Sequence, residues 1–102
     1  MPDFGTPFAG LANERKLTHD ELIRAARFLV SAEYEAVQLY MQLADSTDHV
    51  LAKDVLRDIA DEERVHAGEF LRLLKELAPD EQGFYDQGDK EVEEMMEQLE
   101  SR

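Results

Sequence analysis

The sequence predicts an all-α fold, an antiparallel two-helix hairpin over residues 18–78 followed by a short C-terminal helix. Two long stretches, 19–45 and 49–78, contain no proline and carry apolar residues at the heptad spacing of helices that pack along one another. Only two or three residues separate the two helices, so they must fold back on each other. No stretch shows the period-2 alternation of a strand.

The boundaries of the first helix follow from local signals. Residues 1–17 are expected to form an irregular N-terminal arm, because prolines and glycines are scattered through them without an apolar period. Thr18 and Glu21 have the spacing of a capping box, so the helix is expected to begin directly after Thr18. It can continue to about Asp45, where the residues STD at 46–48 supply a stop and the cap of the next helix.

The second helix is expected to run from about His49 to Ala78, because Pro79 cannot continue it. Residues 79–102 are expected to form a loop, which contains QGFYDQG, and then a short acidic helix over residues 89–101. The apolar residues of that last helix, expected to face inward, are Val92, Met95, Met96 and Leu99.

Composition limits the classes of partner. The 24 acidic and 11 basic residues give a net charge of −13, which would repel nucleic acid and anionic membranes and favour cations. The absence of cysteine excludes disulfides, thiolate metal sites and a rubredoxin-type iron site in these residues. No apolar run approaches the roughly 20 residues of a membrane span, and the N-terminus does not resemble a secretory signal. A cytoplasmic location is therefore expected.

Each helix carries a heptad seam that is apolar except near its middle. The seam of the first helix contains Leu22, Ala26, Leu29, Glu33, Ala36, Tyr40 and Leu43. The seam of the second helix contains Ala52, Leu56, Ile59, Glu63, His66, Phe70, Leu73 and Leu77.

Glu33, Glu63 and His66 are the polar members of these seams, and they predict a metal site. Glu33 lies about 14 residues before the centre of the turn and Glu63 about 15 after it, so both lie roughly 22 Å along their helices. Glu63 and His66 are three residues apart on one helix face. No lysine or arginine occupies a seam position, so a bound cation would offset the cost of burying the carboxylates. Oxygen-rich ligation with one imidazole favours iron or manganese over structural zinc.

Other polar residues have more than one interpretation. A Glu-x-x-His pair alone is common on solvated helix faces, so the metal interpretation depends on the seam position and on Glu33. Tyr40 is either a core residue or a hydrogen-bond donor beside the metal ligands. Glu35 and Glu62 fall off the seams and are expected to be solvated, the alternative being a path by which cations reach the site.

One chain supplies only half of a di-metal ligand set. Such centres in helical bundles use a glutamate from each of two helices and a Glu-x-x-His from each of two more. Only His66 has a glutamate three residues before it, and His19 and His49 are expected to be ordinary surface histidines. A two-fold axis would complete bundle and site together, so the sequence predicts an obligate homodimer with the di-metal centre at its interface.

The segments EYEAVQLY at 33–40 and DEERVHAGEF at 61–70 resemble the short, two-helix encapsulated ferritins of the ferritin-like, rubrerythrin-related superfamily. The resemblance covers about residues 18–78. It implies a dimeric ferritin-like four-helix bundle with two iron ions per dimer, bound by Glu33, Glu63 and His66 of each chain. It places the family's tyrosine at Tyr40 and an acid of the metal entrance at Glu35. It also implies an annular decamer of five dimers and residence inside an encapsulin nanocompartment.

The sequence departs from the family pattern at two places. The second acid of the entrance falls on Ala32, and the final residues, EQLESR, lack an evident apolar tail for encapsulation.

Three function classes remain. The leading interpretation is a ferroxidase that oxidises Fe²⁺ to Fe³⁺ with O₂ for iron storage and detoxification, with Glu33, Glu63, His66 and Tyr40 as its catalytic residues. The alternative enzyme is a rubrerythrin-like peroxide reductase, disfavoured because no cysteine builds the usual electron-transfer iron site. The third class is a non-catalytic helical interaction module in which zinc or calcium only holds the dimer together.

Overall fold

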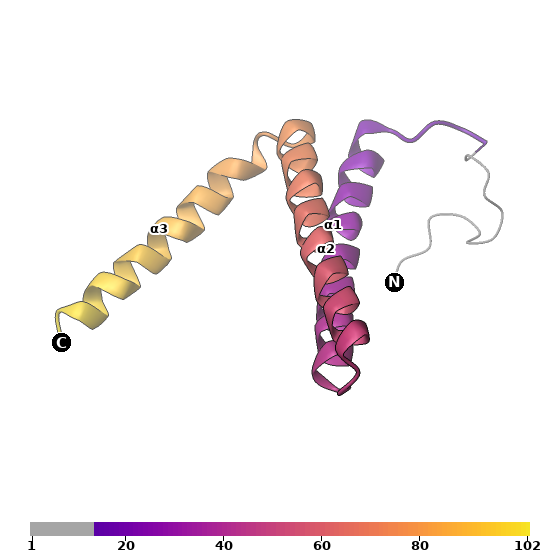
Figure 1. Cartoon of the computed structure of the whole chain (residues 1–102). Helices are drawn as coiled ribbons and strands as arrows, with labels where there is room; N and C mark the ends of the chain where they lie inside the picture. Colours follow the sequence, from indigo (N-terminus) through magenta and orange to yellow (C-terminus); the bar gives the residue numbers. More distant parts are fainter. Residues whose placement is uncertain (1–13) are drawn as a thin grey trace.

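The computed structural model describes residues 14–102, and in that range it contains three α-helices and no strand: α1 (His19–Asp45), α2 (Val50–Leu77) and α3 (Glu81–Glu100). α1 and α2 lie side by side as an antiparallel hairpin, and α3 leaves the open end of the hairpin at an angle (Figure 1). The predicted all-α hairpin with a C-terminal helix is confirmed. Most of the expected N-terminal arm, residues 1–13, lies outside the described residues, and residues 14–17 form no helix.

The capping box that begins α1 is present. The Glu21 backbone N–H donates to Thr18 Oγ1 at 3.2 Å, and the Thr18 N–H donates to Glu21 Oε1 at 3.0 Å. Arg15 adds a bidentate pair, with guanidinium nitrogens 2.7 and 2.8 Å from the two Glu21 oxygens. The Arg15 hydrogen bond, followed by the Thr18 backbone hydrogen bond, lowers the pKa of Glu21 to about 2.

The turn between α1 and α2 is capped differently from the prediction. Ser46 Oγ donates to the Gln42 carbonyl at 2.6 Å and so helps to end α1. The N-cap of α2 is His49 and not a member of the STD segment, because the ring Nδ1 of His49 accepts the Ala52 N–H at 3.1 Å. An unprotonated ring nitrogen can replace the hydroxyl or carboxylate oxygen that usually caps a helix.

His19 also has a structural role that sequence spacing does not reveal. Its exposed ring places Nε2 2.7 Å from the carbonyl oxygen of Leu77, although the two residues are 58 positions apart. The contact joins the first turn of α1 to the last turn of α2, where carbonyl groups lack helical partners. His19 and His49 are therefore exposed, as expected, but both stabilise helix ends.

The two helices meet along a line of small residues and not along the centre of the predicted seams. The buried residues are Ala26, Val30 and Ala44 of α1 with Ala60, Ala67 and Leu74 of α2. Several leucines predicted to pack in the seam remain exposed in the single chain: Leu22, Leu29, Leu43 and Leu73. The apolar stripe on each helix is wider than one helix–helix contact, and small side chains let the backbones approach closely along one edge of it.

The prediction of a loop over residues 79–88 is wrong, because α3 begins at Glu81. Side-chain hydrogen bonds four residues apart support the first turns of α3: Tyr85 Oη donates to Glu81 Oε2 at 2.5 Å and Gln82 Nε2 donates to Asp86 Oδ1 at 2.8 Å. An ion pair between Arg27 and Glu81 joins α1 to the N-terminal end of α3.

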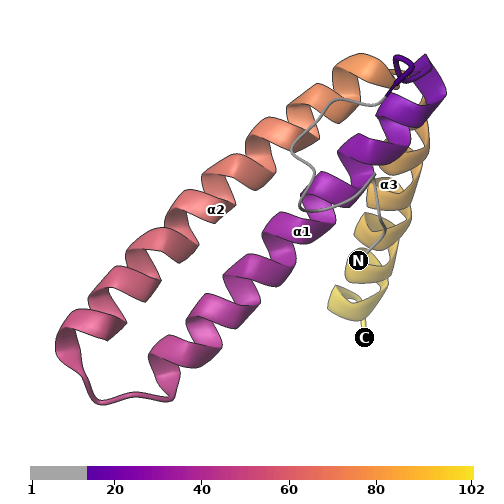
Figure 2. The same ribbon diagram turned by 90° about the vertical axis from the view of Figure 1, so that its right-hand side faces the viewer.

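No residue of α3 is buried, so the apolar residues predicted to face inward are exposed in the single chain. α3 lies behind the hairpin when the hairpin is viewed broadside (Figure 2). Within residues 14–102, no helix combines the length and the apolar character that crossing a bilayer requires.

Candidate metal centre

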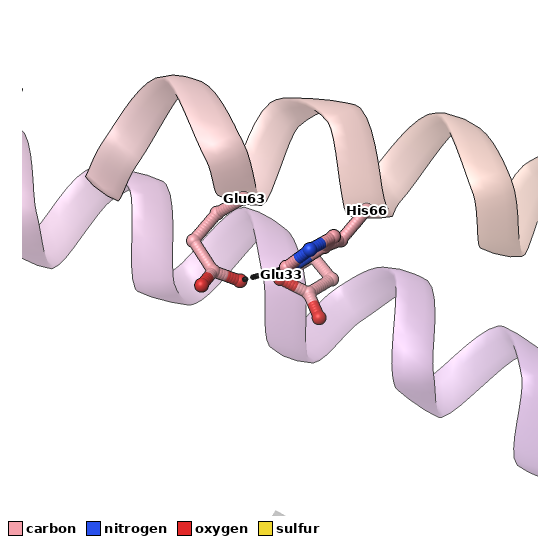
Figure 3. A group of neighbouring side chains, drawn as sticks. All are labelled: Glu33, Glu63 and His66. Carbon is pink, nitrogen blue, oxygen red and sulfur yellow. Dashed lines mark ion pairs between the residues drawn. The ribbon is translucent and has the colours of Figure 1, made fainter. Parts of the chain in front are cut away.

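Three side chains predicted to bind metal meet in the middle of the hairpin (Figure 3). Glu33 comes from α1, and Glu63 and His66 come from α2, where their spacing of three residues places them on one helix face. One ligand atom of each side chain lies within 4.8 Å of the others. His66 Nδ1 is 3.5 Å from Glu63 Oε2 and 3.9 Å from Glu33 Oε2. Glu33 on α1 and Glu63 on α2 therefore lie at the same height along the hairpin, as their similar separation from the turn predicted.

The donor set fits a metal ion. The Glu33 and Glu63 side chains are only 17% and 20% exposed, whereas His66 is 49% exposed. Glu33 Oε2 is inaccessible to solvent and has no hydrogen-bond partner among the described residues. A buried carboxylate oxygen without a partner costs on the order of 1–3 kcal/mol or more. A cation between the two carboxylates and the imidazole would satisfy that oxygen.

Neighbouring residues of α2 point to opposite sides of the hairpin. Ala67 is buried between the helices, so at about 100° per residue His66 and Gly68 lie on opposite sides of it. The side that carries His66 is called the metal face. It consists of Leu22, Leu29, Glu33, Ala36, Tyr40 and Leu43 of α1 and Ile59, Glu63, His66, Phe70 and Leu73 of α2.

The metal face contains no lysine or arginine, although α1 and α2 together carry seven of them. Its leucines are open to solvent in the single chain, with Leu29 and Leu43 43% and 47% exposed. A continuous exposed apolar surface of this kind usually marks an interaction site. The carboxylates thus lie within an apolar surface that places no lysine or arginine beside them.

The other predicted site residues lie outside the three-residue cluster. Tyr40 lies on the metal face, half-buried, seven residues after Glu33, and forms no hydrogen bond with the described part of the chain. Glu35 and Glu62 are exposed and do not contribute to the cluster. A two-residue step rotates Glu35 by about 200° from Glu33, which explains why only one of the pair reaches the cluster.

The geometry is typical of helical proteins in which paired helices bring carboxylates and an imidazole together. The sequence matches the family model described as Rubrerythrin over residues 21–101, so the chain belongs to the rubrerythrin family. It is 41% identical over 75 residues to the encapsulin nanocompartment cargo protein EncC of Myxococcus xanthus, strain DK1622. It is 34% identical over 82 residues to the ferritin-like-encapsulin shell fusion protein of Pyrococcus furiosus.

These matches cover 74% and 80% of the chain but only 57% and 24% of the two relatives, so the chain spans part of each relative's length. A solved structure has the same fold over most of its length. The encapsulated ferritin domain from Pyrococcus furiosus superposes with a TM-score of 0.80 at 30% sequence identity. The superposition covers 90% of this chain and 94% of that domain.

Proposed function

We propose that this protein is a ferroxidase of the encapsulated-ferritin type, which oxidises Fe²⁺ to Fe³⁺ at a centre shared by two copies of the chain. One observation carries the proposal: Glu33 Oε2 is buried and without a hydrogen-bond partner, 3.9 Å from the His66 ring nitrogen, on a face that has no lysine or arginine. Carboxylate oxygens with one imidazole per chain form a ligand set suited to iron. Membership of the rubrerythrin family and the relatives' names support the same chemistry.

The centre requires a second chain. Three ligand side chains are half of the set that a di-iron helical bundle uses, and the exposed leucines of the metal face surround them. A two-fold axis through the metal face would cover those leucines and bring Glu33, Glu63 and His66 of both chains together. The resulting homodimer would hold two Fe²⁺ ions, each of which would lose one electron to the oxidant, O₂.

Each residue of this chain has a definite part. The Glu33 and Glu63 carboxylates attract and hold Fe²⁺, because their charge is partly removed from solvent and no lysine or arginine neutralises it. The His66 ring lies beside both carboxylates and completes the set. Tyr40 lies on the same face, where its hydroxyl would donate to a ligand once the second chain is in place. Glu35 and Glu62 are exposed acids that would attract Fe²⁺ to the centre.

An encapsulin shell is the partner we expect, and the interior of a cytoplasmic nanocompartment the location. The first relative is named as an encapsulin cargo protein, and the second as a fusion to an encapsulin shell. An annular decamer of five dimers stays a prediction of the family resemblance. Two-helix dimers do not enclose a mineral core, so Fe³⁺ must leave the protein and be stored elsewhere.

Oxygen consumption tests the activity. Fe²⁺ is added to the protein in air-saturated buffer and, separately, in anaerobic buffer with H₂O₂, while O₂ and Fe³⁺ are recorded. We expect rapid O₂ uptake and Fe³⁺ formation that a chelator abolishes. Turnover only with H₂O₂ would favour the peroxide reductase, and no turnover with either oxidant would favour a metal-bridged interaction module.

Assembly tests the shared centre. In analytical ultracentrifugation, adding Fe²⁺ anaerobically should shift the chain from monomer toward dimers or larger species, because cations remove the repulsion between carboxylates of two chains. A mass distribution that ignores both metal and chelator would contradict the shared centre. Unchanged iron oxidation in that case would still leave a ferroxidase, but one confined to a single chain.

A further inference from the structure

The half-exposed ring of His66 leaves one of its two nitrogens without a partner. His66 Nδ1 is 3.5 Å from Glu63 Oε2 and 3.9 Å from Glu33 Oε2, so this nitrogen faces the two carboxylates of the cluster (Figure 3). Within residues 14–102, Nε2 of the same ring has no hydrogen-bond partner. A histidine that binds a metal through one nitrogen nearly always donates the N–H of the other nitrogen to a carboxylate, a carbonyl or water, which fixes the tautomer and orients the ring. The cluster thus lacks a group that holds the His66 ring in its binding orientation.

The position of the ring indicates where that group lies. Side chains on a helix lean toward its N-terminus, and the His66 ring reaches Glu63 in the turn before it. Glu62 belongs to the same turn. Around the helix axis, Glu63 lies about 60° to one side of His66 and Glu62 about 40° to the other side. The two glutamates therefore flank the ring, with Glu63 on the metal face and Glu62 at its outer edge.

The carboxylate of Glu62 is free to accept a hydrogen bond. Among the acids of the segment DEER at 61–64, Asp61 is paired with Arg64 at 2.6 Å and Glu63 belongs to the cluster. Glu62 is exposed, and it forms neither a hydrogen bond nor an ion pair with the described part of the chain. A glutamate four residues before its donor is also the favourable order for a pair on a helix surface.

Glu69 is the other exposed acid beside His66, three residues after it. Because the His66 ring leans toward the preceding turn, Glu69 lies on the side of His66 that the ring leaves. Glu62 and Glu69 therefore carry the same charge at a similar exposure, but only Glu62 lies beside the ring.

We propose that Glu62 is a positioning residue, whose carboxylate accepts the Nε2–H of His66 and keeps Nδ1 directed at the cluster, available to Fe²⁺. The role rests on the proposed function, because it requires His66 to be a metal ligand. It goes further by giving Glu62 a specific partner, in addition to a general attraction of Fe²⁺.

A carboxylate that only attracts cations would behave differently. Attraction through solvent depends on charge, decreases with ionic strength and is shared by nearby exposed acids such as Glu69. A hydrogen bond to Nε2 instead depends on an acceptor oxygen at one place. Glutamine keeps such an oxygen without the charge, so it should replace Glu62 in large part.

Co²⁺ binding tests the positioning role without any turnover. The metal-free natural protein, Glu62→Ala, Glu62→Gln and the matched control Glu69→Ala are titrated with Co²⁺ in a calorimeter, at low and at high NaCl. Glu62→Ala should raise the dissociation constant at least about tenfold, the usual effect of removing such a partner of a metal-bound histidine. At high NaCl, Glu69→Ala should change it less than about twofold, and Glu62→Gln should stay within about threefold of the natural protein. Equal dissociation constants for Glu62→Ala and Glu69→Ala at high NaCl, or a Glu62→Gln variant as weak as Glu62→Ala, would overturn the role of Glu62 and leave the metal centre in place.

A double-mutant cycle shows whether Glu62 acts through His66. Adding Glu62→Ala to His66→Ala should change the remaining Co²⁺ affinity less than about twofold, whereas a further tenfold loss would overturn the role. The single variant His66→Ala also separates this role from the proposed function. Natural protein that binds Co²⁺ no more tightly than His66→Ala would contradict the metal centre itself, and the role of Glu62 with it.

Proton NMR of the Co²⁺-loaded protein observes the ring N–H itself. The natural protein should show one strongly shifted signal from the His66 ring N–H that disappears in D₂O, because the hydrogen bond slows its exchange with water. Glu62→Ala should broaden or lose this signal, and Glu69→Ala should keep it. Circular dichroism should be the same for both variants, since both residues are exposed. An unchanged signal in Glu62→Ala would show that another group accepts the N–H, which would overturn the role of Glu62.

Discussion

Within the segment EERVHAG of α2, Glu63 and His66 belong to the metal face, whereas Arg64 and Gly68 line a groove of about 420 Å³ on the opposite side of the hairpin. One face presents half-buried carboxylates within an apolar surface, and the other presents a groove with apolar residues and one arginine, Arg64, which is paired with Asp61. Because one residue rotates a side chain by about 100°, a short stretch can supply two surfaces of different chemistry. The comparison indicates that a two-helix hairpin, too thin to enclose a large core, exposes two sides of different chemistry.

Replacing ligands on the metal face should have the largest effect. His66→Ala and Glu63→Ala should each lower the rate of Fe²⁺ oxidation by about a hundredfold or more, since each removes a group that would bind iron directly. Helicity should be retained, because a half-buried polar group without a full set of partners contributes little to folding. Stopped-flow oxidation assays and circular dichroism measure the two effects.

Glu69→Ala is the matched control for Glu63→Ala, because Glu69 is an exposed glutamate on α2 that belongs to neither surface. Its oxidation rate should equal that of the natural protein. A ligand variant that oxidises iron as fast as Glu69→Ala would remove that residue from the proposed centre.

The second prediction concerns two glutamates that stand two residues apart on α1. Glu33→Ala should remove iron from the centre, whereas Glu35→Ala should at most slow its arrival, because only Glu33 has a carboxylate oxygen in the cluster. Anomalous scattering at the iron edge on crystals of both variants would measure iron at the centre. Iron kept by the Glu33 variant and lost by the Glu35 variant would reverse the roles of the two residues.

A third prediction compares adjacent leucines of α2. Leu74 is 8% exposed between the helices, whereas Leu73 is 42% exposed on the metal face. Leu74→Ala should lower the free energy of unfolding by about 2–5 kcal/mol, the usual cost of emptying a buried leucine site. Leu73→Ala should cost less than about 1 kcal/mol in dilute protein, where the chain is alone, but should weaken the metal-linked dimer.

Urea unfolding at low protein concentration, followed by sedimentation with Fe²⁺, would compare the two leucine variants. Equal destabilisation of the dilute chain would contradict the different burial of these residues, and an unchanged dimer in Leu73→Ala would contradict a subunit contact at the metal face.

The sequence predicted that Glu33, Glu63 and His66 meet, and it did so better than it predicted the helix contact around them. Glu33, Glu63 and His66 could be placed together because each lies at a similar distance from a short turn, and α-helical rise is uniform. The heptad seams did not identify which edge of the stripe the partner helix occupies, since Leu29 and Val30 are both apolar and only packing decides between them. The helix–helix contact forms along the small residues: Ala26, Ala60 and Ala67 are buried, whereas Leu22 and Leu29 are exposed.

The error in α3 has a different cause. Gly83 and Gly88 suggested a loop, because glycine is unfavourable inside a helix. The structure shows helix through both, supported by hydrogen bonds such as that from Tyr85 to Glu81 and by the ion pair to Arg27. Contacts between residues distant in sequence, such as His19 with Leu77, were also beyond the reach of local patterns.

The smallest predicted effect lies away from both surfaces, at the start of α1. The pKa of Glu21 is lowered to about 2, chiefly by its hydrogen bond with Arg15 and then by the Thr18 backbone N–H. A carboxyl group whose pKa is lowered on folding contributes stability above its unfolded pKa, near 4.5, and loses that contribution as pH falls toward 2. Because the pair is exposed, salt should weaken it further.

Glu21→Gln isolates this charge, since glutamine can still complete the capping box with Thr18. The natural protein should melt slightly higher than the variant at pH 7, and the difference in Tm should shrink between pH 4.5 and pH 2 and with added NaCl. Arg15→Gln should also lower Tm at pH 7, as Glu21→Gln does. A difference in Tm that persists at pH 2, or that grows as the pH falls, would mean that Glu21 acts through packing or hydrogen bonding and not through its ionised carboxylate. The start of α1 would then be insensitive to charge, unlike the metal face.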